Sequence, residues 1–241
     1  TPTEIDGQLM YNIREVFIKP GGSAAMEDYY PEYIDENVNI EINVKKPTEI
    51  GLVMLSSTGT KQNTVGYFTY PTDQKPTDIS QVTPIIAYPR ISTAVCNSSS
   101  TAGSMYTGDR VELKYWDGTK FVNEFPAGVS IAWFLIESSY NQGTKEIMNN
   151  KRTFYSIRDL NKSKEHRTIA LKNKSGEVVA FGMEDATNFE PTGDNTRKGN
   201  FGDAVFYLDF SDGSAIETGG VEELPDKSIN DKEIYNSFKG V

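Results

Sequence analysis

The chain has 241 residues, of which 37% are hydrophobic and 11% aromatic, and it carries a formal net charge of −10. Its length suits one large β domain, because sandwiches and barrels often run past about 200 residues as single units. The acidic balance excludes nucleic acid as an expected partner, since phosphate binding requires a basic surface. The longest apolar run, residues 131–136, is far shorter than the ~20 residues of a membrane-spanning helix, so we expect no direct membrane insertion.

Short runs of β-branched and aromatic residues, separated by Gly, Asn, Asp and Pro, predict strands along most of the chain. In chain order the predicted strands are 38–44, 50–55, 64–70, 82–87, 110–115, 129–136, 167–171, 178–183 and 203–210. Their regular spacing predicts an all-β fold, an antiparallel β-sandwich or jelly roll with little helix. The two ends have a different composition, which predicts an N-terminal extension (1–37), a sandwich domain (38–212) and an acidic C-terminal extension or linker (213–241).

Local patterns refine this prediction at four places. Asp117-Gly118 and the segment 173–176 each predict a hairpin turn between two strands. Residues 131–136 are continuously apolar, which is typical of a central strand covered on both faces. One helix is predicted over residues 145–161 from loosely periodic apolar residues.

The chain has one cysteine, Cys96, and one histidine, His166, which limits the metal-binding and catalytic chemistry available to it. They exclude an intramolecular disulfide and a zinc site built from Cys and His. A Ser-His-Asp triad would depend on His166, which is more typical of a surface histidine. The chain opens at Thr1 without a signal peptide, so we expect a mature or truncated form.

The segment 178–210 contains two predicted strands around a loop that is rich in carboxylates and glycine. The acidic residues are Glu184, Asp185, Glu190, Asp194 and Asp203. Calcium takes six to eight oxygen ligands, so this loop has suitable chemistry for a calcium site. The alternative is a solvated turn, because Asp, Asn and Gly are also the usual turn formers.

Five sequence blocks resemble a domain of unknown function found in bacterial surface proteins, namely large secreted adhesins and cell-surface lipoproteins of Bacteroidetes, including the LruC type. Both the content and the order of the blocks match, and the similarity extends over roughly residues 38–212. The blocks are 64–70, 125–136, 167–171, 181–187 and 200–206.

The resemblance implies a β-sandwich that binds calcium through a Gly-Phe-Glu-Asp segment and a later Asp-x-Asp-aromatic-Asn-Asp segment. Glu184 and Asp185 match the first segment, and Asp203 matches the final Asp of the second. These three residues are the expected core ligands, with Asp194, Asn200 and Asn63 as weaker candidates.

This chain departs from the second segment at three positions. The first Asp of the pattern has no clean counterpart unless Asp194 takes its place. Asn200 stands where the family pattern has Asp, and Gly202 stands where it has Asn. Arg197 and Lys198 also bring positive charge into the loop. Because calcium affinity depends on ligand charge, a side-chain cation instead of the metal is the alternative interpretation.

The function that these observations predict is a noncatalytic cell-surface or adhesion-associated domain with a structural calcium-type loop. It would be outer membrane-anchored or secreted, and its partner would be a protein or glycan on a host or neighbouring cell. One alternative is a carbohydrate-binding module with Trp116 and Tyr115 as an aromatic platform. Another is a subunit of a surface fibre that assembles by strand addition. We do not expect an enzyme, because no residue pair in the sequence fixes a glycosidase site and no nucleotide-binding glycine motif is present.

Overall fold

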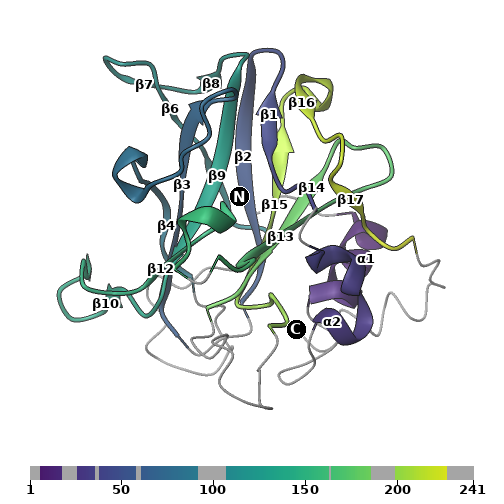
Figure 1. Ribbon diagram of the computed structural model, residues 1–241, viewed down its shortest axis with the longest axis horizontal. Coiled ribbons are helices and arrows are strands. Elements are labelled where there is room, and N and C mark those ends of the chain that lie inside the picture. The colour runs from purple at the N-terminus through teal and green to yellow at the C-terminus, as the bar shows by residue number, and fades with distance from the viewer. Residues whose placement is uncertain are drawn as a thin grey trace.

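The computed structural model describes residues 6–17, 26–35, 38–57, 61–91, 107–162, 164–185 and 199–226. Its strands form two facing sheets, so the predicted β-sandwich is confirmed (Figure 1). All pairings are antiparallel except one short parallel pair, which lies at an edge of the second sheet. In the described part of the chain, no helix is long and apolar enough to cross a membrane.

The first sheet has six strands and the second has seven. The first sheet has the order β16 (Ile216–Glu217), β1 (Ile42–Val44), β9 (Val129–Ile136), β3 (Asn63–Pro71) and β4 (Ile85–Ile91), and β12 (Thr153–Tyr155) also pairs with β9. The second sheet has the order β17 (Glu222–Glu223), β13 (Thr168–Lys172), β14 (Val179–Met183), β15 (Ala204–Phe210), β2 (Thr48–Ser56) and β5 (Arg110–Glu112), and β8 (Glu124–Phe125) also pairs with β2.

Two small hairpins and six short helical elements complete the described chain. The hairpins are β6 (Tyr115–Trp116) with β7 (Phe121–Val122), and β10 (Tyr140–Asn141) with β11 (Glu146–Ile147). The helices are α1 (Gly7–Phe17) and α2 (Met26–Tyr29), and the 3₁₀ turns are η1 (Pro31–Ile34), η2 (Ile79–Gln81), η3 (Arg158–Leu160) and η4 (Gly213–Ala215).

The predicted strands are all present, with shifts at their ends. The largest shift is β4, which was predicted over 82–87 and spans Ile85–Ile91. The predicted turn at 173–176 does join β13 to β14, and Gly176 there has a φ of 74°, a conformation that favours glycine. The Asp117-Gly118 hairpin is also confirmed, since Trp116 pairs with Phe121.

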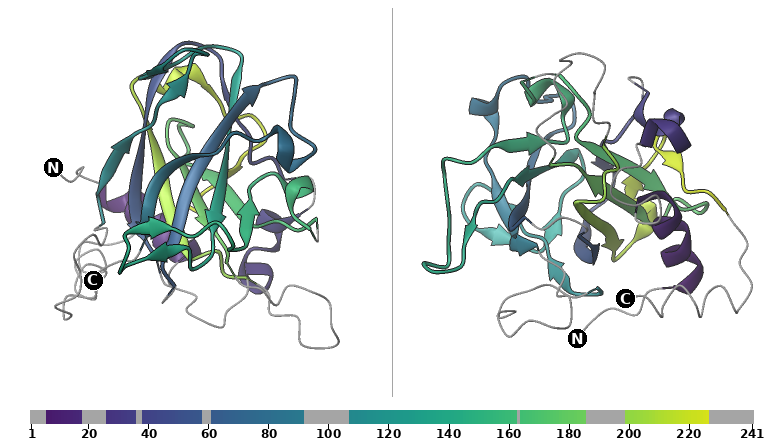
Figure 2. Two further views of the ribbon diagram at one scale, coloured as in Figure 1. Left: turned by 90° about the vertical axis from the view of Figure 1, so that its left-hand side faces the viewer. Right: turned by 90° about the horizontal axis from the view of Figure 1, so that it is seen from below.

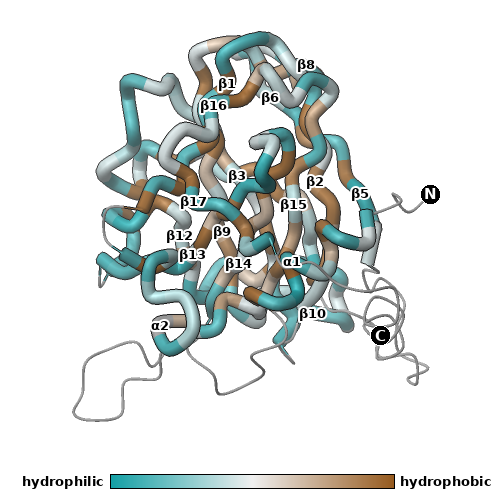
Figure 3. Tube along the Cα trace, turned by 90° about the vertical axis from the view of Figure 1, so that its right-hand side faces the viewer, coloured by the Kyte–Doolittle hydropathy of each residue, from teal (hydrophilic) through white to brown (hydrophobic). Residues whose placement is uncertain are grey.

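The main core lies between the two sheets and is centred on Trp133 of β9, which is fully buried. Its ring lies 5.2 Å from that of Phe181 and 5.4 Å from that of Phe206, both in the second sheet. Strand β9 is buried on its other face as well, where Phe134 packs with Ile157. The prediction of a central strand covered on both faces is therefore confirmed, and Figure 3 shows hydrophobic residues following the strands.

The predicted helix over 145–161 is wrong. Residues there form β11, β12 and the single turn η3. Phe154 of β12 pairs with Leu135 of β9, and Ile157 and Leu160 then cover the outer face of that strand. Pairing with β9 and burial of these side chains therefore outweigh a weak helical periodicity.

The described parts of the two terminal segments also contribute to the core. Helix α1 packs on the outer face of the second sheet with Ile13, Val16 and Phe17 fully buried (Figure 2, right, purple). At the other end, β16 pairs with β1, and β17 pairs with β13. Helix α1 thus covers an apolar sheet face. Strands β16 and β17 provide backbone hydrogen-bond partners for strands that would otherwise be sheet edges.

Candidate metal centre

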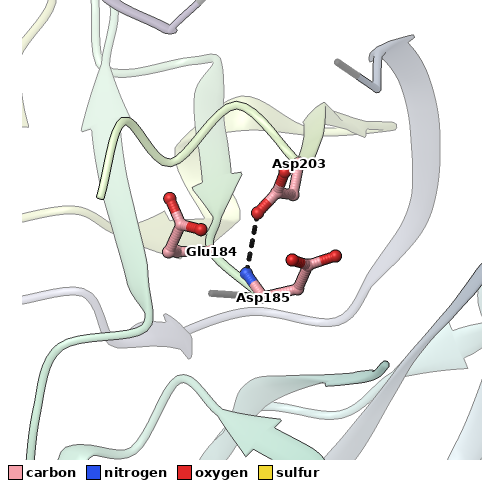
Figure 4. A group of neighbouring side chains, drawn as sticks. All are labelled: Glu184, Asp185 and Asp203. Carbon is pink, nitrogen blue, oxygen red and sulfur yellow. Dashed lines mark hydrogen bonds between the residues drawn. The ribbon is translucent and has the colours of Figure 1, made fainter. Parts of the chain in front are cut away.

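Three carboxylates meet where β14 ends and β15 begins, at one end of the second sheet. Glu184 and Asp185 follow the last residue of β14, and Asp203 precedes the first residue of β15 (Figure 4). Because these strands are antiparallel neighbours, with Met183 opposite Ala204, the three residues must lie together. One ligand atom from each carboxylate lies within 4.8 Å of the others. The predicted convergence of the three core ligands is therefore observed.

Glu184 points toward the outer side of the sheet and is buried. Its Oε2 accepts hydrogen bonds from the backbone N–H groups of Asn200 at 3.0 Å and Phe201 at 3.2 Å. These bonds fix one carboxylate oxygen to the segment that leads into β15. Glu184 thus has a rigid position in the cluster.

Asp185 connects the cluster to the opposite sheet. Its Oδ2 accepts a hydrogen bond from Nδ2 of Asn63, the first residue of β3, at 2.6 Å. The oxygen of the same amide, Oδ1 of Asn63, accepts the backbone N–H of Ser138 at 2.9 Å. Asp185 therefore joins the ends of the two sheets through a buried hydrogen bond.

Lys61 supplies a cation to this cluster that the sequence did not suggest. Its Nζ lies 2.8 Å from Oδ1 of Asp185 and 2.7 Å from Oε1 of Glu137. Burial lowers the pKa of Lys61, but the hydrogen bonds to Asp185 and Glu137 outweigh burial and raise it. The ammonium therefore stays charged and compensates Asp185, leaving the charges of Glu184 and Asp203 facing each other.

Asp203 shows the electrostatic consequence of this arrangement. Burial, a hydrogen bond with the side chain of Glu184, and repulsion from Glu184 and Asp185 raise its pKa from 3.8 to about 9. Its Oδ2 also accepts the backbone N–H of Asp185 at 2.8 Å, which partly offsets the shift (Figure 4). Without a metal ion, Asp203 is therefore protonated at neutral pH and shares its proton with Glu184.

Close packing around Gly182 holds the cluster in place. A Cβ atom at Gly182 would lie 2.4 Å from the ring of Phe17 in α1 and 2.5 Å from the carbonyl oxygen of Phe201. Only glycine allows the helix and the segment before β15 to approach the strand this closely. Helix α2 adds a further link, because the N–H of Met26 donates to the carbonyl of Gly199 at 2.9 Å.

The weaker ligand candidates have different positions. Asn200 lies beside the cluster, but its Oδ1 accepts the N–H of Gly202 at 2.9 Å. Asn63 contacts Asp185, yet both ends of its amide already have hydrogen-bond partners in the protein. Asp194 lies outside the described residues, as do the alternative cations Arg197 and Lys198.

The proposed sugar platform is separate from the carboxylate cluster. Trp116 lies on β6, with 45% of its surface exposed, and its ring packs edge-on against Phe121 at 5.1 Å. Tyr115 instead packs toward Phe125, with ring centroids 5.9 Å apart, at the edge of the main core. Only one of the two predicted platform residues is thus presented to solvent.

Two residues of the site were missed by sequence reasoning. Phe17 carried a usable signal, because apolar residues at 9, 10, 13, 16 and 17 follow helical spacing. Lys61 carried none, since it is 124 residues away from Asp185 in the chain. Such a long-range ion pair becomes visible only when both sheets are in place.

The fold and site together define an antiparallel β-sandwich with a buried three-carboxylate cluster at one end. Residues 125–211 match a family described as a domain of unknown function (DUF4114). This stretch includes β9, β13, β14, β15 and the whole cluster, so the matched region is the part of the fold that builds the site. No curated protein and no solved structure gives a significant match.

Proposed function

We propose that this protein is a noncatalytic domain in which Glu184, Asp185 and Asp203 hold a structural calcium ion. The observation that carries the proposal is the grouping of their ligand atoms within 4.8 Å. Two oxygens bound to one calcium at about 2.4 Å each can lie at most about 4.8 Å apart. Each pair of these ligand atoms is therefore close enough to share one ion.

The charge of the cluster also fits a divalent cation. With Lys61 next to Asp185, a proton on Asp203 removes its repulsion with Glu184. Arg167 also contributes positive charge near Glu184. Calcium, when bound, supplies two positive charges and makes that proton unnecessary. Oxygen ligands without Cys or His match the preference of this hard cation.

The role of such a site is to fix geometry. Glu184 and Asp185 sit at one end of a connection of about twenty residues, and Asp203 sits at the other, so a common ligand limits the freedom of that connection. Asp185 also bonds Asn63 in the first sheet, which extends the constraint to both layers of the sandwich. A rigid sandwich end of this kind suits a domain that presents loops to a partner.

The proposed location is the cell surface, with the protein secreted or anchored to the outer membrane. The resemblance of the five blocks to domains of bacterial adhesins and Bacteroidetes surface lipoproteins supports it. The proposed partner is a protein or glycan on a host or neighbouring cell. An acidic chain with a net charge of −10 is compatible with either.

The direct test is calorimetric titration of the metal-free protein with Ca²⁺ and, separately, Mg²⁺. We expect a saturable heat with Ca²⁺, release of about one proton per ion at neutral pH because Asp203 must ionise, and a higher melting temperature. Repeating the titration in buffers of different ionisation enthalpy measures the proton release. No heat at millimolar Ca²⁺, together with a melting temperature unchanged by chelator, would refute the proposal.

A second candidate function is carbohydrate binding at the β6–β7 hairpin. It is favoured by the exposure of Trp116 (45%) and Phe121 (55%), since exposed aromatic rings can stack on sugars. The competing explanation is that the two rings stabilise the hairpin as a cross-strand pair. A glycan array on which the wild type binds and Trp116→Ala does not would favour the sugar function.

The fibre-subunit alternative can be tested by truncation, but the cut must respect the fold. Residues 216–217 and 222–223 belong to the two sheets, so removing everything after 210 would damage the sandwich itself. Deleting 227–241 alone avoids this. Oligomers in size-exclusion chromatography that disappear after this deletion would support strand-addition assembly.

A further inference from the structure

A cavity of about 390 Å³ lies on the outer face of the first sheet, away from the carboxylate cluster. It opens between the segment 38–41, which precedes β1, and the turn η3. Its floor is Ala132 of β9, and its apolar wall includes Ile157. None of the three cluster carboxylates lines it.

The small side chain of Ala132 helps to leave this space. Outward-facing residues of β9 alternate with the buried inner ones, and the next outward residue, Phe134, is covered by the ring of Tyr155 at 6.5 Å. At Ala132 no large side chain fills the corresponding volume, although the residue itself is 3% exposed. The cavity size lies within the range of about 300 to 1,000 Å³ that is typical of small-ligand sites.

The hydroxyl of Tyr70 at the cavity wall lacks an acceptor in hydrogen-bond geometry within the described residues. Tyr70 is only 6% exposed, and burial raises its pKa, so the phenol keeps its proton. The neighbouring Ser130 hydroxyl interacts with Tyr70 and partly offsets the rise in its pKa, and it also donates to Asn43 at 2.6 Å and contacts Thr72 at 2.9 Å. A buried donor without an acceptor costs stability, and a ligand oxygen in the cavity would remove that cost.

The cavity is lined by two carboxylates and two cationic side chains, so its formal charges balance; these groups are Glu41, Asp159, Lys75 and Arg158, and His166 lies beside them. Lys75 forms an ion pair with Glu41, and Asp159 lies 3.7 Å from Lys164. A charged ligand would have to break one of these pairs, whereas a neutral ligand with several hydroxyl groups can accept from the ammonium and donate to the carboxylates. The chemistry of the cavity therefore favours a neutral polyhydroxylated ligand.

We propose that this cavity binds one hexose unit, either as a free sugar or at the end of a glycan. A hexose ring offers an apolar face to Ala132 and Ile157 and hydroxyl groups to Tyr70, Glu41 and Lys75. Its oxygens can accept the proton of the Tyr70 hydroxyl. The site differs from the β6–β7 hairpin and does not depend on the calcium proposal.

The test uses the full chain with a panel of monosaccharides (glucose, galactose, mannose, fucose and N-acetylglucosamine), observed by saturation-transfer NMR and by titration. We expect at least one sugar to bind, and Tyr70→Phe to weaken that binding about tenfold or more. Since the Tyr70 hydroxyl has no acceptor in good hydrogen-bond geometry among the described residues, Tyr70→Phe should leave the melting temperature unchanged or raise it. Ala132→Leu fills the cavity and should abolish binding.

Two controls separate this site from the others. Trp116→Ala leaves sugar binding intact if the cavity is the site, and excess chelator leaves it intact because the carboxylate cluster is elsewhere. A glycan array with free and terminal hexoses then distinguishes the two sources of the ligand. Silence across the sugar panel, binding that survives both Tyr70→Phe and Ala132→Leu, or binding lost in Trp116→Ala would each overturn the proposal.

Discussion

Replacing Asp203 by asparagine should stabilise the metal-free protein and abolish its response to calcium. The pKa of Asp203 rises from 3.8 to about 9, so at pH 7 the folded chain holds a proton that the unfolded chain has lost. Each pKa unit between 3.8 and the working pH costs about 1.36 kcal/mol. Over about three units the upper bound is about 4 kcal/mol, and solvent screening of this partly buried group reduces it to about 2 to 4 kcal/mol.

The sign of the pH dependence follows from the same shift. Because the pKa is raised in the folded state, the stability associated with Asp203 is fully present below about pH 4 and is lost as the pH rises toward 9. Asp203→Asn has no proton to lose, and its amide oxygen can still accept the N–H of Asp185. The variant should therefore show a flatter pH profile.

Urea denaturation in chelator at pH 5, 7 and 8.5 measures this difference, and a second series with excess Ca²⁺ measures the metal response. Asp209→Asn is a matched control, because Asp209 lies on β15, the strand that follows Asp203; its side chain is 41% exposed and pairs with Arg110 at 2.8 Å. It should change stability by less than about 1 kcal/mol and keep the calcium response. The reasoning fails if wild type and Asp203→Asn lose equal stability between pH 5 and 8.5, or if Ca²⁺ stabilises both equally.

Three further predictions follow from the packing and charges of the site. Lys61→Met removes the ammonium that pairs with Asp185. It should therefore lower the stability of the metal-free protein by about 1 to 3 kcal/mol and tighten Ca²⁺ binding in calorimetry. Weaker Ca²⁺ binding would contradict this. Gly182→Ala should cost about 1 to 3 kcal/mol in urea denaturation, since its Cβ would overlap the ring of Phe17, and an unchanged midpoint would count against that packing. Calcium affinity should rise from pH 5 to 9, because the proton on Asp203 competes with the ion; a pH-independent affinity would show that Asp203 is not a ligand.

Several features of the fold were predictable from local sequence. The strand Val129–Ile136 was predicted with the observed bounds, because continuous apolar residues have few alternatives to a doubly covered strand. The turns at Asp117-Gly118 and 173–176 were also correct, since their backbone conformations depend on the residues in the turn itself. The proximity of Glu184 and Asp203 was predictable for a related reason, because the two residues flank neighbouring strands of one antiparallel pair.

The conformation of residues 145–161, the packing of α1 and the position of Lys61 depend on tertiary contacts. The segment 145–161 has a weak helical pattern, and its pairing with β9 determined its conformation instead. Helix α1 is needed because it covers the outer face of the second sheet. The cation beside Asp185 is Lys61, which comes close only when β3 and β14 face each other. Local residues thus determined the strands, turns and acidic strand ends, because those depend on short-range propensity and patterning. Charge balance, the protonation of Asp203 and the cavity beside Tyr70 depend on contacts between distant segments, which no local pattern encodes.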